Sequence, residues 1–234
     1  MRYAWAVETH VGLTRSRNED AVAPATDGAA DGPVVIAVAD GMGGHAAGEV
    51  ASRIAIETVA VSEAGPAERV VAANQAIVEA AEKRSDQFGM GTTLTLGIFG
   101  ADGTLQIAHV GDSRAYLLRD GKLEQVTSDH TLVARLVAEG HITEEQARHH
   151  PRRHLVMQSI GMRDIEIEER EVQLQPGDRV LLCTDGLTVM IEDSEVATLL
   201  AGASAASAAW ALIDAANAAG GYDNTTVAVV DVAP

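Results

Sequence analysis

Short apolar runs recur along the chain and are separated by turn-forming residues. Their β-branched and alternating apolar residues are typical of strands. We expect nine strands, at residues 3–8, 34–40, 92–100, 105–112, 115–120, 122–126, 165–174, 179–185 and 225–232. Wider apolar spacing predicts helices at 47–63, 68–84, 131–140, 194–202 and 204–220. A capping box from Thr143 to Gln146 predicts a further short helix.

The order of these elements indicates the fold class. Asp102–Gly103 and Asp120–Gly121 are expected to form the turns of two hairpins. Consecutive hairpins favour antiparallel sheets over alternating β-α-β units. We therefore expect an α+β fold. It is a four-layer α-β-β-α sandwich of two mainly antiparallel sheets flanked by helices, with a helical flap inserted around 128–165. Residues 1–234 show no repeat or linker, so we expect a single domain.

The composition of the chain limits which binding partners and which cellular compartment we expect for it. The 234 residues carry a formal net charge of −17 at pH 7, and 47% of them are hydrophobic. So acidic a surface repels nucleic acid and anionic membranes, and no apolar run is long enough to span a bilayer. The single cysteine, Cys183, excludes an internal disulfide. We expect a cytoplasmic, monomeric protein with Cys183 in the core and with Trp5 and Trp210 either in the core or packed between helix and sheet.

Six Asp–Gly pairs occur, and two of them differ from the rest. Four are explained as loop or hairpin residues, at 27–28, 31–32, 102–103 and 120–121. Asp40 and Asp185, by contrast, each end an apolar run that reads as a strand buried on both faces. A carboxylate in such a place is rare unless it is paired or bound to a metal.

Three further acidic residues, Asp20, Asp112 and Asp223, also stand beside predicted strand ends. Each alone is explained equally well as a turn or cap residue. Together with Asp40 and Asp185 they would bring five carboxylates into one pocket, where mutual repulsion raises the pKa values unless cations neutralise the charge. Carboxylates are ligands that Mg²⁺ and Mn²⁺ prefer, so the pattern indicates a site for divalent cations.

Gly41 and Arg15 fit such a site. Because Gly41 has no Cβ, its carbonyl can approach a metal held by Asp40, and a carboxylate that bridges two ions organises a water for attack on phosphorus. Arg15 is expected to bind phosphate oxygens, since a guanidinium group binds phosphate in a bidentate manner. Arg17 is the competing residue, and the alternative for either is a solvated surface arginine.

Six ordered motifs resemble those of the bacterial protein phosphatase 2C family, the metal-dependent (PPM) Ser/Thr phosphatases. They are RSRNED, VADGMGGHAAGEVAS, GMGTTL, HVGDSRAYLL, LLCTDGLT and YDNTTVAVV, and they span essentially the whole chain. The resemblance implies a β-sandwich flanked by helices. It also implies hydrolysis of phosphoserine and phosphothreonine by direct attack of a water or hydroxide that bridges two Mn²⁺ or Mg²⁺ ions, with a weaker third ion.

Residue roles in the metal centre follow from this resemblance. Asp40 would bridge the two core metals, and Gly41 would offer its carbonyl to one of them. Asp185 and Asp223 would complete the second core site. Asp112 would join Asp185 in the third, weaker site.

The remaining motif residues would act around the metals. Asp20 would act on the metal-bound waters or bind a metal directly, and Arg15 would hold the phosphate. Asn224 is expected to be a positioning residue. His45 matches a candidate general acid, a role that suits an imidazole at neutral pH. The alternative for His45 is a simple contact with substrate or water at the start of a helix.

The flap segment departs from the family pattern. Gln158 stands where arginine is common, and Val189, near Asp185, stands where an acidic residue is common. Exposed positions, rather than a zinc site, are expected for the flap histidines His141, His149, His150 and His154. Either contact with an acidic phosphopeptide or simple solvation would explain the flap arginines Arg148, Arg152 and Arg153.

Three functions are compatible with the sequence. The first is an active phosphoprotein phosphatase whose substrates are phosphorylated by a bacterial Ser/Thr kinase. The second is a catalytically silent scaffold that binds phosphopeptides, and the third is a hydrolase of small phosphoesters. Retention of all five acidic residues and of Arg15 favours the first.

Overall fold

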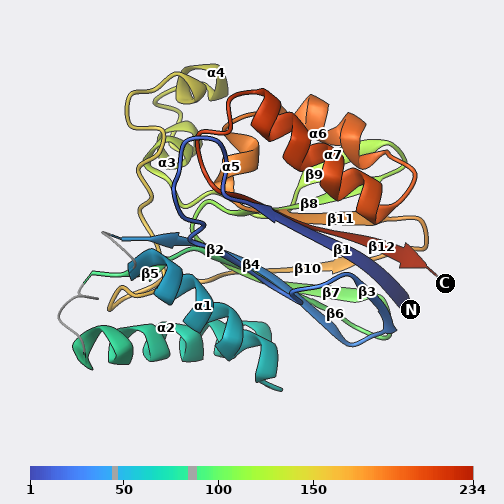
Figure 1. Ribbon diagram of the computed structural model, residues 1–234, viewed down its shortest axis with the longest axis horizontal. Helices are drawn as coiled ribbons and strands as arrows, with labels where there is room; N and C mark the ends of the chain where they lie inside the picture. The colour runs from blue at the N-terminus through green and yellow to red at the C-terminus, as the bar shows by residue number, and fades with distance from the viewer. Residues whose placement is uncertain (44–46, 84–88, 234) are drawn as a thin grey trace.

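Two sheets form the centre of the computed structural model, which describes residues 1–43, 47–83 and 89–233 (Figure 1). The first sheet has the strand order β3-β1-β12-β11-β8-β9, and its strand pairs are antiparallel. Its strands are β1 (Arg2–His10), β3 (Gly28–Asp31), β8 (Arg114–Arg119), β9 (Lys122–Gln125), β11 (Arg179–Cys183) and β12 (Thr225–Ala233).

The second sheet has the order β10-β7-β6-β4-β2, with β5 paired to β4 outside this path. Its pairs are also antiparallel. Its strands are β2 (Asp20–Ala23), β4 (Val34–Met42), β5 (Gly91–Thr92), β6 (Leu94–Phe99), β7 (Thr104–Val110) and β10 (Glu168–Gln173). The predicted hairpins are confirmed, because β6 pairs with β7 and β8 pairs with β9.

Helices cover the outer face of each sheet, which gives the four predicted layers (Figure 1). On the second sheet lie α1 (Ala47–Val61) and α2 (Pro66–Lys83). On the first lie α5 (Asp185–Thr188), α6 (Asp193–Leu200) and α7 (Ala205–Ala218). Three apolar clusters result: one between the sheets, one under α1 and α2, and one under α6 and α7. The expected α+β sandwich is therefore confirmed.

The strands that deliver Asp40 and Asp185 are buried on both faces, as expected. In β11, Leu181 packs toward the helices and Leu182 toward the other sheet. In β4, Ala37 and Val38 alternate in the same way between the outer and the central cluster. Asp40 therefore lies near the end of one packed strand, and Asp185 follows shortly after the end of the other.

The flap between β9 and β10 contains α3 (Leu132–Ala138) and α4 (Glu144–Arg148). The helical insertion predicted at 128–165 is thus confirmed. Helix α4 begins with the expected capping box, in which Thr143 accepts from the backbone of Gln146 and the Gln146 side chain accepts from the backbone of Thr143. None of the helices in the three described segments has the length and apolar character needed to cross a membrane.

Two expectations about local structure are wrong. Residues 28–31, expected to be a loop, form the edge strand β3 against β1, where Gly28 lies so close to the Trp5 ring that a Cβ would be 2.9 Å from Cε2. Trp210, expected in the interior, is 57% exposed on α7. The buried face of α7 is filled by small and aliphatic residues such as Ala209 and Leu212, which leave no room there for an indole.

Candidate active site

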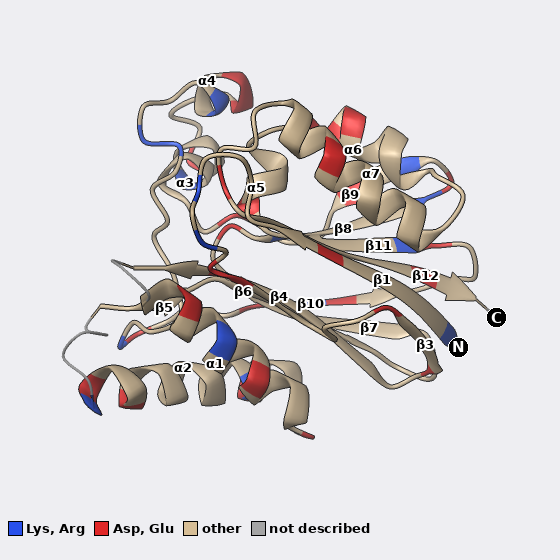
Figure 2. Cartoon of the chain, in the orientation of Figure 1, with Lys and Arg blue, Asp and Glu red and all other residues tan. Residues whose placement is uncertain are grey.

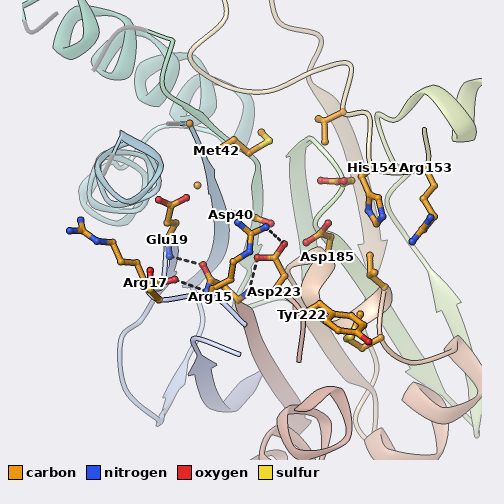
Figure 3. Close-up of a pocket in the computed structure, with 18 residues that line it drawn as sticks. Arg15, Arg17, Glu19, Asp40, Met42, Arg153, His154, Asp185, Tyr222 and Asp223 are labelled. Atoms are coloured by element: carbon orange, nitrogen blue, oxygen red, sulfur yellow. Dashed lines mark hydrogen bonds and ion pairs between the residues drawn. The ribbon is translucent and has the colours of Figure 1, made fainter. Parts of the chain in front are cut away.

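A cavity of about 1050 Å³ opens where the ends of β4 and β12 meet α5, the loop after β1 and the flap (Figure 3). Six of the residues predicted to bind metal or phosphate line it: Arg15, Asp40, Gly41, Asp112, Asp185 and Asp223. Asp20 stands beside them, opposite Asp40 in the pairing of β2 with β4. The structure thus brings the five acidic residues of the prediction to one end of the sandwich.

Charge is distributed unevenly around this cavity. Figure 2 shows acidic residues at the ends of β4 and at the start of α5, beside a basic segment in the loop after β1. Figure 3 shows Asp40, Asp185 and Asp223 in the middle, with Arg15 on one side and His154 on the other. Acidic residues therefore lie in the middle of the cavity, with Arg15 and Arg17 on one side and Arg153 and His154 on the other.

Asp20 is held by two hydroxyl groups. Its Oδ2 accepts hydrogen bonds from Thr184 Oγ1 at 2.8 Å and from Thr226 Oγ1 at 2.7 Å. Its Oδ1 is buried and has no hydrogen-bond partner within the described chain, and the same is true of Asp185 Oδ1. Buried carboxylate oxygens without partners are costly, so both atoms are suited to a cation.

The electrostatics of the acidic residues agree with this geometry. Burial, with smaller contributions from the charges of Asp185 and Asp223, raises the pKa of Asp20 to about 7, against the lowering effect of the hydrogen bonds from Thr226 and Thr184. Burial raises the pKa of Asp112 to about 8, again with a contribution from Asp185. Burial, followed by the charges of Asp20 and Asp185, raises the pKa of Asp40 well above its usual range. A cluster of this kind attracts divalent cations, which remove the repulsion.

Gly41 is required by backbone packing. Its N–H donates to the carbonyl of Glu19 at 3.2 Å, and a Cβ at this position would lie 2.5 Å from the same oxygen and closer still to the carbonyl of Gly48 in α1. A Cβ on Gly48 would in turn lie 2.7 Å from the Gly41 carbonyl oxygen. The two glycines let the end of β4 touch the first turn of α1, which adds a packing reason to the metal-approach reason inferred from the sequence.

Arg15 is paired with one of the acidic residues. Its guanidinium donates to Asp223 Oδ2 at 2.7 Å, and both side chains are partly exposed. Arg17, the competing candidate, also lines the cavity. Its backbone carbonyl accepts from the side chain of Asn224 at 2.8 Å, so Asn224 fixes the loop that carries both arginines. This contact agrees with the positioning role expected for Asn224.

Sequence reasoning missed Glu19. It lines the cavity, and its backbone is held at both ends, because its N–H donates to Asn224 Oδ1 at 2.8 Å and its carbonyl accepts from Ser52 Oγ at 2.5 Å. Burial raises the pKa of Glu19. Glu19 could have been predicted as a site residue from the sequence, because it stands next to Asp20 in the RSRNED motif.

His45 lies outside the described residues, so its expected role stays a prediction. The flap histidines are spread over separate contacts in the part of the chain that the structure describes: His141 lies 3.3 Å from Glu139, and His149 lies 3.3 Å from Glu145. His154 reaches the cavity together with Arg153. His141, His149 and His154 are exposed, as expected, whereas His150 is half-buried.

Comparison with known proteins gives the same picture. The family model described as Protein phosphatase 2C matches residues 13–212. Serine/threonine protein phosphatase PstP of Mycobacterium tuberculosis is 42% identical over 237 residues, which cover 97% of this chain and 45% of that protein. Serine/threonine phosphatase stp of Listeria monocytogenes is 41% identical over 214 residues, which cover 85% and 84% of the two chains. The chain thus spans less than half the length of PstP.

Solved structures agree over the full length of the chain. The crystal structure of M. tuberculosis PstP/Ppp superposes with a TM-score of 0.92, at 40% identity and with 100% of both chains covered. The catalytic domain of PstP in complex with two manganese ions superposes with a TM-score of 0.88, at 39% identity and with the same coverage. The chain therefore belongs to the protein phosphatase 2C family.

Proposed function

We propose that this chain is a Mn²⁺- or Mg²⁺-dependent phosphatase of phosphoserine and phosphothreonine in proteins. The observation that carries the proposal is the acidic cluster, in which Asp20 and Asp185 each keep a buried carboxylate oxygen without a partner, next to the guanidinium of Arg15. Support comes from the relatives, which are Ser/Thr phosphatases, and from the PstP structure that holds two manganese ions.

The acidic cluster would hold the cations. Asp40, Asp185 and Asp223, with the carbonyl of Gly41, are proposed as ligands of two core ions. The oxygen ligands suit hard divalent ions, and Cys183 is buried away from this cluster in the core under α6 and α7. When bound, two such ions supply a hydroxide for attack on phosphorus and neutralise the phosphate oxygens.

Two further acidic residues would complete the centre. Asp112 is proposed as a ligand of a weaker third ion, shared with Asp185. Asp20 is fixed through Oδ2 by Thr184 and Thr226, which leaves Oδ1 to bind a cation or to accept a proton from water. The hydrogen bonds to Oδ2 therefore fix the position of Asp20 and leave Oδ1 unbonded within the described residues.

Arg15 would bind the phosphate of the substrate. In the structure its guanidinium donates to Asp223, so the phosphate and Asp223 compete for the same donors. With Asp223 engaged as a metal ligand, its pair with Arg15 would weaken, and Arg15 would be available for bidentate contact with phosphate. Metal binding and phosphate binding are therefore expected to favour each other.

The flap would contact the peptide around the phosphorylated residue. Arg153 and His154 line the cavity on the side away from Arg15, so an acidic phosphopeptide would meet cationic groups on both walls (Figure 3). We propose proteins phosphorylated by a bacterial Ser/Thr kinase as the substrates. We further propose that residues 1–234 act as one catalytic domain, monomeric and cytoplasmic.

The test is hydrolysis of a phosphothreonine peptide with MnCl₂, with EDTA, and by Asp40→Asn. We expect activity only for the wild type with Mn²⁺. A matched control is Asp120→Asn, which alters another Asp–Gly pair, at a hairpin tip with a positive φ of 51° that asparagine tolerates.

Other results would select the other functions. Turnover that survives EDTA would refute the metal-dependent mechanism. Hydrolysis of p-nitrophenyl phosphate without hydrolysis of any phosphopeptide would favour a hydrolase of small phosphoesters. Binding of phosphopeptide without turnover of either compound would favour the silent scaffold.

A further inference from the structure

A buried network of hydroxyl and imidazole groups lies beneath the acidic cluster. It comprises Thr93, Thr95, His109 and Ser113, each with no exposed surface. Polar groups in such a place are costly unless they are hydrogen-bonded, so a network of four calls for an explanation. None of the four belongs to the site described above.

Thr93 joins this network to Asp40. Its Oγ1 accepts the backbone N–H of Asp40 at 2.9 Å, and its own N–H donates to the carbonyl of Asp40 at 2.9 Å. The same Oγ1 lies 2.7 Å from Ser113 Oγ. A single side chain therefore connects the backbone of Asp40 with the residue that follows Asp112.

The residues on both sides of Asp112 are held by the rest of the network. Thr95 Oγ1 lies 2.9 Å from His109 Nδ1 and 3.1 Å from the carbonyl oxygen of Ser113, and its single hydroxyl proton is shared between these two acceptors. His109 Nε2 lies 3.0 Å from the carbonyl oxygen of Gly111. Since a carbonyl can only accept, His109 donates through Nε2.

Gly111 is held by His130 as well. The N–H of Gly111 donates to His130 Nδ1 at 3.2 Å, and the N–H of His130 donates back to the Gly111 carbonyl at 2.7 Å. Gly111 has a φ of +118°, and a Cβ there would lie 2.5 Å from Thr93 Cγ2. The turn that carries Asp112 is therefore pressed directly against Thr93.

The two histidines form part of a group that could itself suggest a metal site. Ligand atoms of His109, His130 and Glu168 all lie within 4.8 Å of one another. However, both ring nitrogens of His109 and Nδ1 of His130 already contact Thr95 and Gly111, and both carboxylate oxygens of Glu168 accept from Ser128. The two imidazoles are therefore used for hydrogen bonds to Thr95 and to the backbone of Gly111.

We propose that Thr93 and Ser113 are positioning residues, whose paired hydroxyls set the placement of Asp112 relative to Asp40. The third-ion site would then depend on two hydroxyl groups that touch neither the metal nor the substrate. This inference rests on the proposed function, because it takes Asp112 as a metal ligand.

The test is a titration with MnCl₂ in which free Mn²⁺ is measured by electron paramagnetic resonance, without any substrate. Comparison of the wild type with the Asp112→Ala variant identifies which bound Mn²⁺ ion depends on the carboxylate of Asp112. Thr93→Val keeps the branched shape and removes the hydroxyl, and Ser113→Ala removes its partner. We expect each to weaken the Asp112-dependent ion about tenfold, since each breaks a buried hydrogen bond. The double variant should bind this ion little more weakly than Thr93→Val alone, because Ser113→Ala removes a hydrogen bond that Thr93→Val has already broken, whereas Thr93→Val also removes the acceptor of the Asp40 N–H.

Two controls separate positioning from a general loss of stability. Thr127→Val removes another buried hydroxyl, which accepts from the N–H of Ala115 at 3.0 Å, and should lower the unfolding temperature without changing Mn²⁺ affinity. Thr93→Ser retains the hydroxyl and should restore the wild-type affinity. If Thr93→Val does not fold, Ser113→Ala alone decides the question.

Wild-type Mn²⁺ affinity in Ser113→Ala, or equal weakening in Thr127→Val, would overturn the proposal. Unchanged Mn²⁺ binding in Asp112→Ala would overturn both the ligand role of Asp112 and this inference. Phosphopeptide turnover by the wild type would still stand in that case, so failure here is distinguishable from failure of the proposed function.

Discussion

The ionised form of Asp20 is expected to destabilise the metal-free protein. Burial raises its folded-state pKa from 3.8 to about 7, whereas in the unfolded chain the carboxyl ionises near its ordinary value. The folded state therefore binds the proton more tightly than the unfolded state. Stability is lost as the pH rises from about 4 through about 7, and the loss is complete above the folded-state pKa.

The magnitude follows from the two pKa values. Each tenfold change in the acid dissociation constant corresponds to about 1.4 kcal/mol, so the cost is roughly 4 kcal/mol at pH 8 and roughly 2 kcal/mol at pH 5. Asp20→Asn removes the ionisable group and keeps an oxygen that can accept from Thr184 and Thr226. The variant should be more stable than the wild type at both pH values, and more so at pH 8.

Urea unfolding in EDTA at pH 5 and pH 8 measures this difference, with Asp120→Asn as the control for an exposed aspartate. We expect the gain from Asp20→Asn to be roughly 2 kcal/mol larger at pH 8. Saturating MnCl₂ should reverse the order, because only the wild type keeps the full set of carboxylates. A wild type whose stability does not change between pH 5 and pH 8, or an Asp20→Asn variant less stable at pH 8, would refute the reasoning.

Two further predictions concern Arg15 and Gly41. Arg15→Ala should lower kcat/KM for a phosphothreonine peptide roughly 10- to 100-fold, the value of a charged hydrogen bond, while the free energy of unfolding stays within about 0.5 kcal/mol because the Arg15–Asp223 pair is exposed. Steady-state kinetics with Mn²⁺ measures this effect, and an unchanged kcat/KM in Arg15→Ala would contradict a phosphate-binding role for Arg15. Gly41→Ala should cost more than about 2 kcal/mol in urea unfolding, since its Cβ would meet the backbone of Glu19 and Gly48. If the Gly41→Ala variant were as stable as the wild type, the backbone around Gly41 would be able to shift and make room for the added Cβ.

Most of the sandwich could be predicted because its strands are continuous apolar runs. In β4 and β11 both faces are buried, and the hairpin turns carry Asp–Gly pairs, so pattern and turn chemistry agree. The edge strand β3 could not be predicted, because Gly, Ala and Asp have low strand propensity. It forms through pairing with β1, which the local sequence does not encode.

Side-chain placement on α7 shows a second limit of the sequence. The helix contains many alanines, and the apolar pattern does not say which face they fill. The alanine face packs closely against β1 and β12, and Trp210 remains outside it. The buried location expected for Trp210 is therefore wrong.

The acidic residues of the site could be predicted, whereas their support could not. Asp40 and Asp185 are conspicuous because each follows a buried strand. The hydroxyls that hold Asp20, and the pairing of Thr95 with His109 across β6 and β7, depend on strand register. Threonine and serine are common in strands and turns for many reasons, so only the folded arrangement distinguishes these residues.

The acidic cluster is proposed to bind divalent cations. The most direct measurement is a crystal structure of the protein grown with MnCl₂, with data collected at the manganese absorption edge. We expect two strong anomalous peaks between Asp40, Asp185 and Asp223, and a weaker third peak at Asp112. Strong peaks elsewhere, or an acidic cluster without any peak at saturating MnCl₂, would show that the acidic cluster is not the cation site.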